Sequence, residues 1–287
     1  MTIAIIAGSV LLFLAGLWLI VRWGGMAVQP PPVRPPVGDG PFTDRRTARA
    51  AAVRRYFWWA DLWCFTALIT GLLIAWPGGR LVMRVLAATS PGSAQGRLTE
   101  AQANVGFITL DGTVALLVFG GMPTAFLASL VYLAIRRWLP PGRLAGPVAG
   151  LLGIVVFGAG AEPFRTNNVD FTFIRPGWLS VLLFILLSVL IGAMVAAVAG
   201  WYSHRLPLFT RRTVPAYLPL LTAIIFPPAA VLILLGALLV LVWPGMADGR
   251  RSSASPKYLW AGRVVLALAV LLTLPSFVAA VSFILTV

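Results

Sequence analysis

Seven long apolar stretches, separated by short polar connections, dominate the hydrophobic pattern of the chain. They cover residues 3–21, 57–76, 112–135, 144–161, 178–201, 214–243 and 259–287. A helix needs roughly 20 apolar residues to cross about 30 Å of hydrocarbon, where the backbone has only its own hydrogen bonds. The pattern therefore predicts an all-α fold, a polytopic integral membrane bundle of about seven transmembrane helices.

The order of these stretches predicts three parts. Residues 1–23 are expected to form an N-terminal transmembrane anchor helix, residues 24–56 a proline-rich spacer with a basic juxtamembrane segment, and residues 57–287 a six-helix transmembrane bundle. Six prolines within twelve residues of the spacer favour an extended polyproline conformation, so the first helix is expected to stand apart. From Arg45 to Arg55 we expect a short basic helix on anionic headgroups of the lipid bilayer, or a stop-transfer charge cluster.

The composition also indicates an integral membrane protein, and it limits the kinds of site that the chain can form. Of the 287 residues 60% are hydrophobic and 10% charged, and the formal charge is +14. The basic residues lie between the apolar runs and form no continuous patch, which argues against binding of nucleic acid. One cysteine and one histidine exclude a disulfide framework and a Cys/His zinc site. No metal, cofactor or catalytic residue is predicted.

Charges in the connections predict the orientation. The first, third and fifth connections hold thirteen basic residues, and the second, fourth and sixth hold nine. Short loops rich in Lys and Arg remain cytoplasmic. We therefore expect a multi-pass protein of the plasma membrane with its N-terminus outside and its C-terminus in the cytoplasm.

Pro227 and Pro228 interrupt the sixth stretch and allow two interpretations. If they reverse the chain into a re-entrant hairpin, the loop with Arg250, Arg251 and Lys257 changes sides. Seventeen basic residues then lie on the cytoplasmic side and five on the other. However, the 30 residues of this stretch span only about 45 Å as a helix, which is too short for two full crossings. A single helix kinked at the prolines is the preferred interpretation.

Tryptophans near the ends of the stretches are typical of an aromatic belt at the membrane interface. Trp58 or Trp59 and Trp76 bracket the second stretch, and Trp178 and Trp201 bracket the fifth. Their positions independently support helices at these two places.

Small residues at a spacing of four predict close contacts between helices. Gly192, Ala196 and Gly200 lie on one side of the fifth helix, and Gly146 and Gly150 do so on the fourth. Such stripes let two backbones approach within the membrane. We expect internal packing, with oligomerisation as the alternative.

Polar residues of the second and fourth connections form a candidate site on the outer face. Pro77 to Gly79 are expected to end the second helix, and the Thr99–Gln102 spacing predicts a new helix at Glu100. The candidate residues are Arg80, Arg84, Glu100, Asp111, Glu162, Arg165 and Asp170. They bind an anionic group in one interpretation, and in the preferred one they form loop salt bridges, each of which is weak.

Asp61 is the acidic residue predicted to lie within the second helix near its inner end. Arg54 or Arg55 is its expected partner in an interfacial ion pair. The functional alternative is a proton or cation site, because acids in membrane segments often mark such sites.

The absence of catalytic motifs favours a function by association. The leading hypothesis is a non-catalytic, bacterial-type integral membrane protein that acts as a scaffold or accessory subunit, with other membrane protein subunits as partners. One alternative is a small-solute or lipid transporter or channel. Another is a lipid-modifying membrane enzyme with Glu100, Asp111 and Glu162 at an outer-face site.

Overall fold

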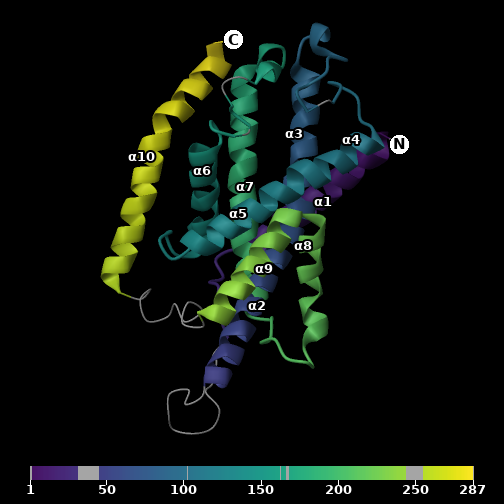
Figure 1. Ribbon diagram of the computed structural model, residues 1–287. Coiled ribbons are helices and arrows are strands. Elements are labelled where there is room, and N and C mark those ends of the chain that lie inside the picture. Colours follow the sequence, from purple (N-terminus) through teal and green to yellow (C-terminus); the bar gives the residue numbers. More distant parts are fainter. Residues whose placement is uncertain are drawn as a thin grey trace.

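The computed structural model describes residues 2–31, 45–101, 103–161, 163–165, 168–243 and 255–286, and it confirms the all-α fold. The helices are α1 (Thr2–Trp23), α2 (Arg45–Thr70), α3 (Trp76–Thr89), α4 (Leu110–Ala115), α5 (Met122–Ile135), α6 (Ala145–Phe157), α7 (Gly177–Ser203), α8 (Thr222–Ile225), α9 (Pro227–Val242) and α10 (Pro256–Thr286). Within these ranges, five helical segments are long and apolar enough to span a membrane (Figure 1).

The second helix does not end at Pro77 as expected. A π-helical segment, Gly71–Ala75, joins α2 to α3, and the helical run continues over 43 residues from Thr47 to Thr89. A π turn widens the backbone spiral just before the proline, where an α turn would place the ring against a carbonyl. The same arrangement recurs where the π-helical segment Leu116–Gly121 precedes Pro123 in α5. The basic segment is likewise part of α2, which begins at Arg45.

The two π-helical regions contact each other. A Cβ atom at Gly121 would lie 2.8 Å from Cβ of Trp76, and the indole nitrogen of Trp76 donates a hydrogen bond of 3.0 Å to the carbonyl of Thr113. Glycine at position 121 therefore lets the helix of α4 and α5 cross closely over the junction of α2 and α3.

The sixth stretch is a helical hairpin, and the expected single kinked helix is wrong. Tyr217, near the start, donates a hydrogen bond to Pro207 just beyond the end of α7. Phe226, at the turn, stacks on Phe126 in the middle of the bundle. Beyond the turn, α9 descends again (Figure 1), and the carbonyl of Ile233 accepts a hydrogen bond from Tyr56 in the first half of α2. The chain thus enters and leaves the bundle at the same end.

We name the two ends of the bundle after the first and last residues of α7, as the Gly177 end and the Ser203 end. α1 reaches the Ser203 end, where Trp23 stacks on Trp201 with ring centroids 4.1 Å apart. α10 begins at this end, where Gly262 packs on Trp138, and it finishes at the Gly177 end, where Ile284 meets Gly177. The connections 90–109 and 158–176 lie at the Gly177 end (Figure 1).

The first helix packs against the bundle and does not stand apart. Gly16 of α1 faces Ile74 so closely that an added Cβ would meet the side chain at 2.6 Å. Phe13 reaches Gly78 in α3. α1 therefore runs from the Gly177 end toward the Ser203 end beside α3 and α7, and Thr2 and Thr286 both belong to the Gly177 side. Because an odd number of spans would place the two termini on opposite sides, this arrangement corresponds to an even number of spans.

The glycine stripes of α6 and α7 pack on each other, which confirms the prediction of internal packing. An added Cβ at Gly146 would lie 2.6 Å from the carbonyl oxygen of Gly192 and 2.8 Å from Cβ of Ala196. Gly150 meets the backbone of Ser188 in the same way. The two helices thus approach through their backbones, which gives them close dispersion contact.

Candidate functional site

The two connections at the Gly177 end are joined by a cluster around Glu100. The Glu100 carboxylate forms an ion pair with Arg165 and accepts a hydrogen bond of 2.9 Å from the backbone N–H of Val169. In return, the backbone N–H of Glu100 donates to Asp170 at 3.0 Å. Three of the predicted site residues are therefore brought together, and their polar atoms bond to one another and to the backbone.

A second set of contacts ties the same two connections. Ser90 accepts a 3.0 Å hydrogen bond from the backbone N–H of Arg175, and its hydroxyl oxygen also lies 3.2 Å from the Arg175 carbonyl oxygen. Arg97 lies over the ring of Phe173 at 4.8 Å. These contacts brace the loop after α3 against the loop before α7.

No helix begins at Glu100, contrary to the sequence-based expectation. The Thr99 hydroxyl bonds to both backbone groups of Ala103, and Leu98 pairs with Asn104 across a short turn. The helix begins instead at Leu110, where Thr109 caps it by accepting from the N–H of Gly112 at 3.0 Å. The Thr99 hydroxyl is bonded within its own turn, so it does not cap a helix. The Thr99–Gln102 spacing therefore did not predict the structure correctly.

Arg80 and Arg84 share a helix face but have different surroundings. Trp76, Arg80 and Arg84 are spaced by four residues, so they follow one side of α3. Arg84 is exposed and donates to the carbonyl of Gly106 at 3.1 Å. Arg80 is buried, and its Nε and Nη2 atoms have no hydrogen-bond partner among the described residues. Because the helix continues into α3, the Arg80 guanidinium lies inside the bundle and not at a membrane interface.

The other acids predicted for this site do not join the cluster in the described part of the chain. Asp111 is exposed in the first turn of α4, where a negative charge suits the helix dipole. Glu162 lies outside the described residues. Among the described residues, no group of three or more His, Cys, Asp or Glu side chains is placed to hold a metal ion.

Asp170 gives the cluster around Glu100 a testable dependence on pH. Desolvation raises the pKa of its carboxyl above the usual range, so ionised Asp170 opposes folding, and this cost appears as the pH rises through the folded-state pKa. Asp170→Asn keeps an acceptor for Glu100 without the charge, and we expect it to flatten this part of the pH profile. Asp170→Ala also removes the acceptor and should cost about 1 kcal/mol of stability. Thermal unfolding between pH 4 and 8 checks both expectations, and equal profiles for Asp170→Asn and the native chain would contradict the first.

A second polar centre surrounds Asp61, which is fully buried in α2. Its Oδ2 atom accepts a hydrogen bond of 2.9 Å from the hydroxyl of Tyr202 in α7. No ion pair joins it to Arg54 or Arg55 in the described structure, and both arginines lie one or two turns nearer the start of the helix. Asp61 is thus bonded to a neutral hydroxyl on another helix, and not to a neighbouring cation.

The Tyr202 hydroxyl lies between two acceptors. It is 2.9 Å from Oδ2 of Asp61 and 3.1 Å from the carbonyl oxygen of Ala216 in the ascending arm of the hairpin. A phenol has one proton and can donate to only one of them. A proton on Asp61 would complete the second bond, because the acid could then donate to Tyr202 while Tyr202 donates to Ala216. The centre therefore links α2, α7 and the hairpin through a chain that can hold a proton.

Sequence analysis did not identify Tyr202 as a partner of Asp61. It stands next to Trp201 at the end of an apolar run, which is also the pattern of an interfacial belt. The stacking of its ring on Phe65, at 3.8 Å between centroids, depends on how α2 and α7 pack. No spacing along the chain carries that information.

The comparisons with known proteins give no relative for this arrangement. No family model matches the chain, and neither a curated protein nor a solved structure has a significant similarity to it. The contacts described above are therefore the basis for a function.

Proposed function

We propose that this chain is a non-catalytic integral protein of the plasma membrane that acts by association, as a scaffold or accessory subunit of a membrane complex. The observation that carries the proposal is the use of Glu100. Both of its carboxylate oxygens and its backbone N–H are bonded within the loop cluster. A catalytic carboxylate has to face a substrate, whereas this one braces two connections.

The arrangement of the helices supports an orientation of the protein in the membrane. We infer six membrane crossings and one re-entrant hairpin, with both termini outside. The hairpin returns to the Ser203 end, where α10 also begins, so the connection with Arg250 and Arg251 starts and ends on that side. Counted by connection, seventeen of the 22 basic residues then fall on one side, which is the cytoplasmic side by the positive-inside rule.

Native electrophoresis after mild solubilisation, combined with cross-linking in intact membranes, tests the association. We expect the protein to migrate in a complex well above its own 30.7 kDa and to cross-link to another membrane subunit. Migration as a monomer, without any cross-linked partner, would contradict the proposal.

A second function, proton-coupled or cation transport, is favoured by one observation. Asp61 is a buried acid between α2, α7 and a re-entrant hairpin, and such acids are typical of ion pathways. Reconstituted liposomes with imposed proton or cation gradients provide the assay. Flux that is lost in Asp61→Asn and kept in Asp111→Asn, whose acid is exposed, would favour transport over association.

A further inference from the structure

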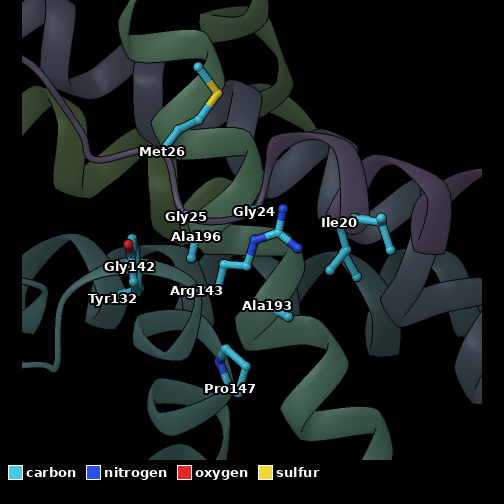
Figure 2. Close-up of a pocket in the computed structure, with 11 residues that line it drawn as sticks. Ile20, Gly24, Gly25, Met26, Tyr132, Gly142, Arg143, Pro147, Ala193 and Ala196 are labelled. Carbon is cyan, nitrogen blue, oxygen red and sulfur yellow. The ribbon is translucent and has the colours of Figure 1, made fainter.

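A cavity of about 140 Å³ opens at the Ser203 end of the bundle, between α1, α5, α6 and α7. Figure 2 shows the Arg143 side chain extending across it toward Gly24, with Tyr132 on one side and Ile20 on the other. By the same measure a single water needs about 10–15 Å³, so the space holds a group of roughly ten non-hydrogen atoms. The cavity is thus large enough for a phosphate with part of the molecule that carries it.

The lining combines one cation with a hydroxyl and an apolar wall. Arg143 supplies a guanidinium and Tyr132 a phenol, and no acidic residue lines the cavity. The apolar part of the wall includes Ile20, Val21 and Pro147. A guanidinium binds phosphate with two parallel hydrogen bonds, so this lining suits an anionic group attached to an apolar body.

The rim of the cavity is held by the segment that follows α1. Gly25 adopts φ +90°, a conformation that favours glycine, and a Cβ there would lie 3.0 Å from Cγ of Arg143. The backbone N–H of Gln29 donates to Ser203 at 3.1 Å, and the His204 ring bonds to the carbonyl of Ala27 at 3.0 Å. The segment is therefore tied to the end of α7 at the rim of the cavity.

The cavity also lies at the depth of the membrane interface. Trp23 and Trp201 stack beside it at the ends of their helices, as tryptophans do at headgroup level. On the proposed orientation this is the cytoplasmic leaflet, which carries the anionic lipids of the cell. A phospholipid can therefore reach the cavity from the bilayer without leaving it.

We propose that this cavity is a binding site for one anionic phospholipid, with the phosphate held by Arg143 and Tyr132 and the glycerol region against Ile20, Val21 and Pro147. The site is separate from the basic start of α2. A lipid fits better than free phosphate because only an attached apolar body occupies the rest of the wall. Arg143 stands in the first turn of the helical run Gly142–Phe157, whose unpaired N–H groups add to the attraction for an anion.

Native mass spectrometry of the detergent-solubilised full chain, titrated with dioleoyl phosphatidylglycerol, tests the site. We expect one phosphatidylglycerol per chain in preference to phosphatidylcholine, and at least about tenfold weaker binding in Arg143→Gln, since a charge-assisted bidentate contact is lost. The matched control is Arg137→Gln, an exposed arginine of the same connection that does not line the cavity. Arg143→Lys should restore part of the affinity.

Three outcomes would overturn the proposal. Equal losses in Arg143→Gln and Arg137→Gln would mean diffuse electrostatic attraction in place of a site. Inorganic phosphate that binds as tightly as the lipid, with the same dependence on Arg143, would mean a free anion as the ligand. An unchanged affinity in Arg143→Gln, with the buried Cys64 thiol still protected from a thiol reagent, would mean that a correctly folded chain does not need this residue.

Discussion

Gly192→Val is expected to destabilise the protein by about 3 kcal/mol or more, because it forces α6 and α7 apart. A Cβ at position 192 would meet the carbonyl oxygen of Gly146 and lie 2.8 Å from Cα of Gly150. These are backbone atoms, so no change of side-chain rotamer relieves the overlap. The two helices must separate along their whole contact, which also loosens Ser188, whose hydroxyl bonds to Gly150 at 2.9 Å.

The chain contains its own probe for this measurement. Cys64 is the only cysteine and is fully buried, so a fluorogenic thiol reagent reports unfolding on heating. Gly192→Val should lower the midpoint by roughly 10 °C. Gly153→Val is the control, because nothing lies within 4 Å of a Cβ added at this position of α6, the helix that packs on α7. Equal midpoints for both variants would show that the helices do not approach through these glycines.

Trp58→Ala is expected to cost about 3–5 kcal/mol, as truncations of fully buried tryptophans do. Trp58 has no exposed surface and belongs to the core between α2 and α7. Its indole nitrogen donates a hydrogen bond of 3.0 Å to the carbonyl of Leu206, in the connection that leads into the hairpin. The variant therefore leaves a cavity and an unpaired buried carbonyl at the base of the hairpin.

The neighbouring tryptophan provides the control for this substitution. Trp59 is partly exposed and stacks under the guanidinium of Arg136 at 4.5 Å. Its replacement by alanine should cost only about 1–2 kcal/mol. The Cys64 reaction compares the two variants directly. A loss for Trp59→Ala as large as that for Trp58→Ala would contradict the different burial of the two rings.

Much of the fold can be predicted from the apolar pattern alone. The helices α1, α7 and α10 match their predicted stretches within three residues at each end, because length and hydropathy decide them. The contact of α6 with α7 is also predictable, since small residues at a spacing of four face one another. In each case the signal is local and needs no knowledge of neighbouring helices.

Prolines limit what the sequence predicts. Pro77 and Pro123 lie inside continuous helical runs because a π-helical segment precedes each of them. Pro227 and Pro228 instead begin a new helix after a chain reversal at Phe226. The difference depends on packing, since Phe226 stacks on Phe126 and the returning helix bonds to Tyr56. A proline in the sequence is compatible with all of these outcomes.

The polar centres were predictable in part. Glu100, Arg165 and Asp170 come from two connections on the same side, so their association follows once the spans are placed. Asp61 was identified as an unusual acid, but an arginine on the same helix was its expected partner. Its hydrogen bond to Tyr202 joins residues 141 positions apart, and such a contact is set by tertiary packing.

The side of the membrane on which Ser255 lies decides whether the sixth stretch crosses the membrane or forms a re-entrant hairpin. Ser255→Cys places an exposed thiol just before α10 in a chain whose native Cys64 is buried, and Ser93→Cys places one in the loop after α3, at the Gly177 end. With an impermeant thiol reagent on intact cells, we expect labelling of Ser93→Cys and protection of Ser255→Cys until the cells are permeabilised. Labelling of Ser255→Cys in intact cells would contradict the re-entrant hairpin and the orientation built on it.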